Sequence, residues 1–164
     1  MSCTAPPDAY FDARLAGALE ADVHWSARDM RCDGMRRPDG KGLRVTFSGA
    51  AGGKHLTLVF GVSNLAEGAG GKAVPVNVTL IREGGALYGT RGDDKCVFDE
   101  VTQQRLPDGK GGKGVRRWRI EAHGFCLDPA RAVGAGRDAI LVARFDFRGP
   151  IAWEPDTPAA TARR

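Results

Sequence analysis

Four cysteines are the residues of this chain whose chemistry is easiest to anticipate. Cys96 and Cys126 fall in two separate segments of alternating apolar and polar residues, and we predict a disulfide that joins two strands. The alternative is a pair of buried free thiols, and the separation of the two Cα atoms decides between them. Cys3 begins a polar stretch that contains two prolines. It either carries a lipid, as in a mature bacterial lipoprotein, or forms a disulfide with Cys32.

A second group of soft donors lies between residues 30 and 35. Met30, Cys32 and Met35 place three sulfur atoms within six residues, and His24 is close in sequence. Thioether, thiolate and imidazole ligands together suit Cu(I). The simpler interpretation is that the methionines pack in the core and that Cys32 is oxidised, because these residues are also ordinary core residues. We favour this interpretation and predict no metal and no cofactor, with copper binding as an alternative.

The other reactive side chains form no catalytic or zinc-binding pattern. The three histidines, His24, His55 and His123, lie in three different segments and lack the close spacing of a zinc site. The sequence has no serine-hydrolase elbow, no P-loop and no dinucleotide-binding fingerprint. An enzyme needs a pocket in which titratable groups converge, and the sequence assembles none. We therefore predict no catalytic residue and expect that the protein is not an enzyme.

Basic side chains are densest around Trp118. We propose a partner-binding patch that consists of Lys110, Lys113, Arg116, Arg117 and Arg119. The alternative is the solvent-exposed face of a strand with a solubilising loop. The net charge is only +4, and lysines and arginines are spread over the whole chain. A nucleic-acid-binding protein concentrates its basic residues on one element, so we expect no nucleic-acid partner.

Alternation with a period of two residues predicts the elements that hold these side chains. The odd positions from Phe11 to Trp25 are mostly apolar, which indicates one half-buried strand with Gly17 as a candidate bulge. The alanines and leucines in the middle of this segment leave a helix there as the alternative. The same alternation predicts strands at residues 43–47, 56–62, 74–80, 96–101, 118–126 and 141–147. Turns or loops are expected at residues 33–42, 49–54, 63–72, 83–85 and 107–114, where glycine, proline and polar residues cluster.

The fold class that follows is all-β. About seven to nine antiparallel strands at this spacing favour a single sandwich of jelly-roll or immunoglobulin-like type. We expect the sandwich domain at residues 10–153, an N-terminal tether at residues 1–9 and a disordered C-terminal tail at residues 154–164. No apolar run approaches the roughly 20 residues of a membrane-spanning helix.

Two segments resemble a known group of proteins. Residues 32–47 contain Cys32-Asp33-Gly34-Met35 followed by Pro38-Asp39-Gly40, and residues 76–84 begin Val76-Asn77-Val78-Thr79. They resemble stretches of uncharacterised bacterial envelope proteins, which share a cysteine-containing turn of this kind. The resemblance extends over most of the chain through a strand that begins at Cys96 and another that ends at Cys126. It implies a periplasmic or lipoprotein β-sandwich and no particular activity.

The function that we expect is that of a non-catalytic envelope protein. It would be a lipoprotein or a periplasmic binding module, in the periplasm or anchored to the outer membrane. Its partner would be a protein or another envelope component, with a membrane tether through Cys3 if that residue is lipidated, and we expect a monomer. One alternative is an inhibitor or immunity protein that inserts residues 63–72 or 107–114 into the cleft of an envelope-acting enzyme. The other alternative is a periplasmic copper-binding protein.

Overall fold

The structure is a computed structural model, and it describes residues 7–37, 41–107, 114–134 and 136–154. Every regular element in these residues is a β-strand, so the prediction of an all-β fold is confirmed. These described residues form eleven strands, whereas we expected about seven to nine. In chain order they are β1 (Tyr10–Gly17), β2 (Ala21–Ser26), β3 (Met30–Arg36), β4 (Leu43–Ala51), β5 (Lys54–Val62), β6 (Gly71–Arg82), β7 (Leu87–Gly89), β8 (Cys96–Arg105), β9 (Arg116–Cys126), β10 (Ala130–Ala132) and β11 (Ala139–Trp153).

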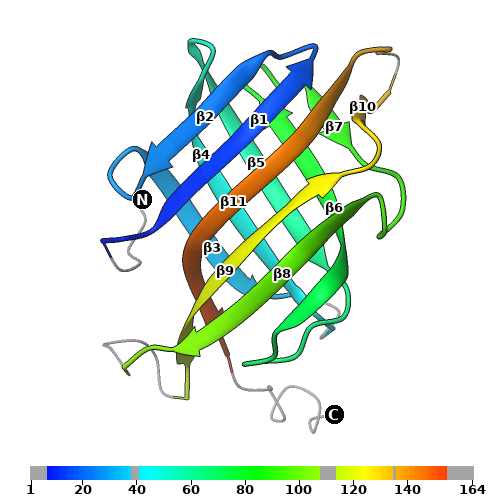
Figure 1. Cartoon of the computed structure of the whole chain (residues 1–164). Helices are drawn as coiled ribbons and strands as arrows, with labels where there is room; N and C mark the ends of the chain where they lie inside the picture. The colour runs from blue at the N-terminus through cyan, green and yellow to red at the C-terminus, as the bar shows by residue number, and fades with distance from the viewer. Residues whose placement is uncertain (1–6, 38–40, 108–113, 135, 155–164) are drawn as a thin grey trace, which may run out of the picture.

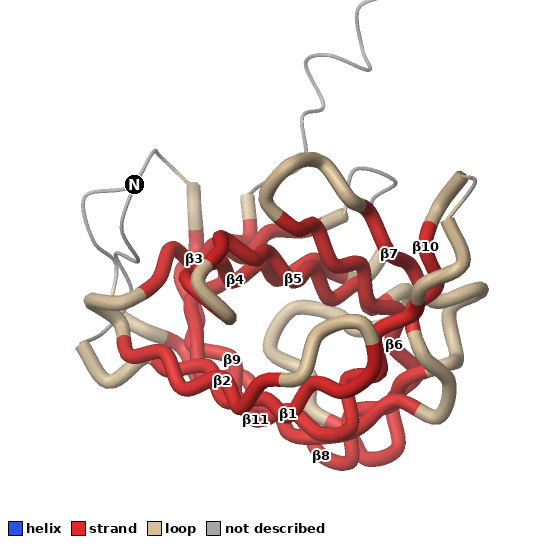
Figure 2. The backbone as a smooth tube through the Cα atoms, turned by 90° about the horizontal axis from the view of Figure 1, so that it is seen from above, coloured by secondary structure: helices blue, strands red, loops and turns tan. Residues whose placement is uncertain are grey.

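The strands form two facing layers. In Figure 1, β2, β1, β11, β9 and β8 make up the front layer, and β3, β4, β5, β6 and β7 make up the back layer. Figure 2 shows the same two layers from above. Neighbouring strands pair antiparallel, except that β3 and β11 meet in parallel at a single pair, Met35 and Ala152.

Hydrogen bonds connect the two layers on both sides. The first half of β6, residues 71–76, pairs with β8 of the front layer, and residues 77–82 pair with β5 of the back layer. On the opposite side, the end of β11 reaches β3. The eleven strands therefore belong to one continuous sheet that closes on itself. The jelly-roll or immunoglobulin-like type that we expected stays a prediction.

Aromatic side chains fill the space between the layers. The Phe47 ring on β4 lies 4.8 Å from the Phe147 ring on β11, so this contact joins the back layer to the front layer. Phe11 from β1 stacks on Phe47 at 4.9 Å. Six phenylalanines are fully buried: Phe11, Phe47, Phe60, Phe98, Phe145 and Phe147. Aromatic rings bury large areas and interlock at specific angles, which makes this interior dense and rigid.

The segment that was predicted as one strand at residues 11–25 is a hairpin. The apolar positions are correct, because Phe11, Val23 and Trp25 are buried. However, Gly17 has a φ of 102°, which a residue with a side chain rarely adopts, and the chain turns there instead of bulging. The pairing of β1 with β2 follows. The alternation continues through the turn, so periodicity alone did not indicate the break.

The last strand contains a bulge that the pattern concealed. A regular alternation through residues 141–147 places Leu141 and Ala143 on the same face as Phe145, but the buried residues are Ile140 and Val142. The pairing of β1 with β11 shifts between Val142 and Arg144, which inserts one extra residue. One extra residue moves all following side chains to the opposite face. The inward face therefore changes from even to odd positions within β11.

The folded part begins slightly before the first strand. Asp8 and Ala9, which we assigned to the tether, contact the sheet: Ala9 is buried, and Asp8 forms ion pairs with Arg119 and Arg148. Residues 1–6 of the proposed tether and 155–164 of the proposed tail lie outside the described residues. Among the residues described, none belongs to a helix with the length and apolar character needed to cross a membrane.

Candidate functional site

The predicted disulfide between Cys96 and Cys126 is present. The two residues lie directly opposite each other on β8 and β9, and both are buried. The bond closes a loop with a sequence separation of 30 and fixes the register of the two strands. Cys32 is not a free thiol in the structure. Cys3 lies outside the described residues, so its lipidation and its pairing with Cys32 both stay predictions.

The three soft donors between residues 30 and 35 do not converge. Met30 and Cys32 lie on the inward face of β3, and Met30 is buried in the core. Met35 lies on the outward face, where its sulfur is 3.6 Å from an Arg44 nitrogen. Within the described ranges, no group of three or more histidine, cysteine or acidic side chains is placed to hold a metal ion. The three histidines lie on different strands: β2, β5 and β9.

The basic patch is divided between two faces of β9. Arg116 points toward the loop of residues 63–70, where its guanidinium donates two hydrogen bonds of 2.7 Å to the carboxylate of Glu67. Arg119 lies on the outer face, 3.2 Å from Asp8 and 3.5 Å from Glu121. Arg117 lines a small hollow beside the contact of β3 with β11. Lys110 and Lys113 lie outside the described residues, so the role of the complete patch stays a prediction.

Residues 63–70 pack against the sheet instead of extending into solvent. Leu65 is buried, and the Gln103 side chain donates hydrogen bonds to the carbonyl groups of Ala66 and Ala69 at 2.9 and 3.0 Å. Trp118 donates a further hydrogen bond of 2.7 Å to Glu67. This loop is therefore a fixed part of the fold, and the inhibitory role that we considered for it stays a prediction. Most of the other candidate loop, residues 108–113, is outside the described part of the chain.

A polar network covers the outer face of the front layer. The Tyr10 hydroxyl donates a hydrogen bond of 2.8 Å to Asp146, and Arg148 lies over the Tyr10 ring at 5.5 Å. Burial, together with the hydrogen bond and the negative charge of Asp146, raises the pKa of Tyr10 to about 12. Arg148 also lies 2.8 Å from Asp8 and 3.2 Å from Glu121. These groups pair with one another, apart from the Nε atom of Arg148, which is buried without a hydrogen-bond partner. Such mutual pairing is typical of a structural role.

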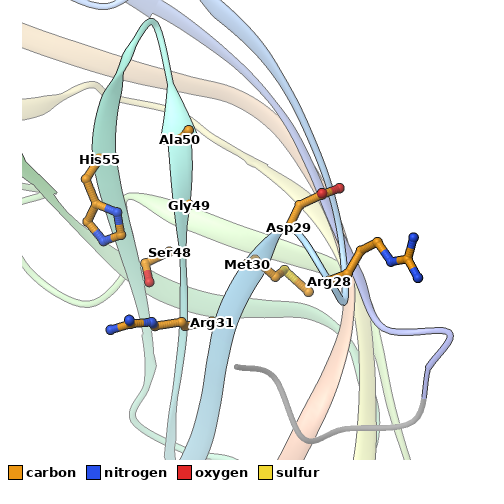
Figure 3. A pocket seen from close by; sticks show the side chains of 8 residues that line it. All are labelled: Arg28, Asp29, Met30, Arg31, Ser48, Gly49, Ala50 and His55. Atoms are coloured by element: carbon orange, nitrogen blue, oxygen red, sulfur yellow. The ribbon is translucent and has the colours of Figure 1, made fainter. Parts of the chain in front are cut away.

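A shallow pocket of about 380 Å³ lies on the outer face of the back layer (Figure 3). It involves β3, β4, β5 and the turn that precedes β3. Its lining consists of Arg28, Asp29, Met30, Arg31, Ser48, Gly49, Ala50 and His55. In Figure 3, the Arg31 side chain extends across β4 toward the side of His55, with Ser48 between them, whereas Arg28 points away.

Strand register fixes the side chains of this pocket. Arg31 on β3 is directly opposite Ser48 on β4, and His55 on β5 is opposite Ala50. Trp25 supports the pocket from the core side, where its indole donates a hydrogen bond of 2.8 Å to the Ala50 carbonyl. A Cβ atom on Gly49 would lie 2.8 Å from the Trp25 ring, so only glycine allows this close packing. The pocket therefore has a rigid base.

The neighbouring carboxylates are already engaged. Asp29 accepts hydrogen bonds from the hydroxyl and the backbone N–H of Ser26 at 2.7 and 3.1 Å. These hydrogen bonds, with the adjacent charge of Arg28, hold the pKa of Asp29 below its usual value. Glu83 accepts a hydrogen bond of 2.8 Å from the backbone N–H of His55. Among the described residues, no carboxylate forms an ion pair with Arg31.

Arg31 and Ser48 were not among the predicted site residues. We had assigned residues from 33 onward to a turn, whereas β3 continues to Arg36. The sequence does show that Ser48 is a polar residue within a largely apolar strand. Its side chain faces outward but is only 8% exposed. Its neighbour Arg31 becomes apparent only when the pairing of β3 with β4 is known.

Comparison with known proteins identifies no relative. No protein-family model, no curated protein and no solved structure matches the chain.

Proposed function

We propose that the protein is a non-catalytic binding module of the bacterial envelope that contacts its partner through the outer face of β3, β4 and β5. The observation that carries this proposal is the distribution of polar side chains. Apolar residues fill the space between the layers, while the pocket with Arg31, Ser48 and His55 opens outward. A partner would therefore be recognised from outside the sheet, by side chains that rigid strands hold in place.

Two observations support an envelope location, in the periplasm or at the outer membrane. The disulfide between Cys96 and Cys126 is the kind of bond that persists in oxidising compartments. The resemblance of residues 32–47 and 76–84 to bacterial envelope proteins points to the same compartment. The location can be tested by blocking free thiols in intact cells with a maleimide before fractionation. We expect unlabelled Cys96 and Cys126 in the envelope fraction, and labelled thiols in the cytosolic fraction would contradict the proposal.

The binding face can be tested by photo-cross-linking in envelope extract. Thr57 on β5 is opposite Ser48 and partly exposed, so a photoreactive residue there samples the proposed face. Thr102 on β8 is exposed in the opposite layer and provides a matched control. We expect one defined adduct from position 57 and none from position 102. Equal labelling from both positions, or none from either, would count against binding through this face.

A further inference from the structure

The pocket on the back layer presents hydrogen-bond donors from neighbouring strands. Arg31 supplies a guanidinium from β3, Ser48 a hydroxyl from β4 and His55 an imidazole from β5. Figure 3 shows Ser48 between the other two side chains. An arginine fork matches the geometry of an oxyanion, and hydroxyl and imidazole N–H groups add donors from other directions. The arrangement therefore suits a ligand with several acceptor oxygens.

The charges around the pocket favour an anion. Arg31 has no ion-pair partner among the described residues, whereas Asp29 and Glu83 are held by hydrogen bonds from Ser26 and from the backbone of His55. An anion at Ser48 would thus meet the hydrogen-bond donors of the pocket. The neighbouring carboxylates of Asp29 and Glu83 already accept hydrogen bonds from the protein.

The number and direction of the donors select the class of anion. A carboxylate has two oxygens in one plane, and the Arg31 fork alone would satisfy it. A tetrahedral phosphate or sulfate has additional oxygens out of that plane, which Ser48 and His55 could reach from the adjacent strands. The pocket volume of about 380 Å³ is large enough for a phosphate or sulfate group that is part of a larger molecule. We infer that this pocket binds a phosphate- or sulfate-type oxyanion. The inference rests on the proposed function, for which it names the ligand chemistry.

The test is an NMR titration of the full chain labelled with ¹⁵N. Sodium sulfate and sodium phosphate are added separately, with sodium chloride at matched ionic strength as the reference, because exposed charges respond to salt in general. We expect saturable shifts of the amide signals of Arg31, Ser48 and His55 with both oxyanions and not with chloride. Shifts that fail to saturate, or that chloride reproduces, would overturn the inference.

Matched variants separate the pocket from the overall charge. We expect Arg31→Gln to weaken sulfate binding by roughly tenfold or more, because a charge-assisted hydrogen bond is lost. Ser48→Ala should weaken it less, by a few-fold. Arg144→Gln is the control, since Arg144 is exposed on β11 in the front layer and has no ion pair among the described residues. Equal weakening by Arg31→Gln and Arg144→Gln would mean general attraction and would overturn the inference.

Two additional comparisons identify the source of the anion and separate this inference from the proposed function. Tighter binding of glucose 6-phosphate than of inorganic phosphate would indicate an anion carried by a larger molecule, and the reverse would indicate a free ion. If sulfate and phosphate fail to bind while cross-linking from position 57 still yields its adduct, the inference is wrong and the proposed function stands. If the anions bind but the adduct is absent, the proposed function fails instead.

Discussion

Gly124 lies on the buried face of β9, where the backbone of β8 comes very close. A Cβ atom at this position would be 1.9 Å from the Val97 carbonyl oxygen and 3.0 Å from the Phe145 ring. The register of β8 with β9 shifts next to this point, between Phe98 and Glu100. Glycine is thus required at position 124 because the backbones of β8 and β9 approach each other too closely for a side chain. Its φ does not fall in the left-handed region.

We therefore predict that Gly124→Ala destabilises the protein by about 1–3 kcal/mol, the usual cost of excess volume in a packed core. The measurement is the free energy of unfolding in urea. Gly89→Ala on β7 is the control, because a Cβ atom there meets nothing within 4 Å. The control should change stability by no more than about 0.5 kcal/mol. Equal effects of both substitutions would show that close approach at Gly124 is unimportant.

Single residues also show what the sequence could predict. The pairing of Cys96 with Cys126 was predictable, because each cysteine lies in an alternating segment of its own. The separation of Met35 from Met30 was not, because we had assigned residues 33–42 to a turn and therefore did not recognise the faces of β3. Arg116 and Arg119 are neighbours in sequence but have different carboxylate partners, Glu67 and Asp8. Side chains three positions apart on a strand point to opposite faces.

At the scale of elements, composition predicted the loop of residues 63–70 but not the contacts that hold it. Glu67 accepts hydrogen bonds from both Arg116 and Trp118. Gly68 packs against the Trp118 ring, where a Cβ atom would be only 2.9 Å away. The small residues here permit close packing on an indole. Sequence alone did not reveal these contacts, because Glu67 and Arg116 are 49 residues apart.

We predict that Glu67→Gln releases this loop. The hydrogen bonds from Arg116 hold the pKa of Glu67 below its usual value. Burial alone would raise this pKa, but the hydrogen bond from Trp118 also lowers it. The side chains of Arg116 and Glu67 are 38% and 25% exposed, so solvent screening reduces the cost of losing the pair to about 1–2 kcal/mol. Hydrogen exchange of residues 63–70 should accelerate at the same time.

The same prediction has a pH dependence with a definite sign. Because the pKa of Glu67 is lowered in the folded state, its contribution is present above the unfolded carboxyl pKa and is lost as the pH falls through the lower folded value. The stability difference between wild type and Glu67→Gln should therefore shrink in acid. Glu20→Gln is the control, since Glu20 pairs with Arg14 but is 62% exposed. A loop that exchanges at the wild-type rate in Glu67→Gln would contradict the prediction.

The strands themselves were largely predictable, but their partners were not. Alternation located β4, β5, β8 and β9, since one face of each is buried. It could not show that β6 pairs with β8 along its first half and with β5 along its second half. A strand that passes from one layer to the other keeps the same period of two residues. The same limitation applies to the bulge in β11 and to the hairpin at Gly17.

At the scale of the whole molecule, the two sides of the closed sheet differ in strength. On one side, β6 pairs with β8 through several residues. On the other side, the only residues of β3 and β11 that pair in the described part of the chain are Met35 and Ala152, and a small hollow of about 90 Å³ lies beside them. Gly34 makes this contact possible, because a Cβ atom there would be 2.2 Å from the Pro150 carbonyl oxygen. The seam between β3 and β11 should be the place where the sheet opens first.

We predict that Gly34→Ala opens this seam without unfolding the rest of the protein. The added methyl group forces β3 away from β11, at a cost of about 1–3 kcal/mol in the free energy of unfolding. Hydrogen exchange measured by mass spectrometry should accelerate in β3 and in residues 150–153, while β6 and β8 keep their protection, because their pairing lies on the other side. Gly89→Ala again serves as the control, since its site is open. If exchange accelerates uniformly over all strands, the seam is not an independent weak point, and the sheet opens as one cooperative unit.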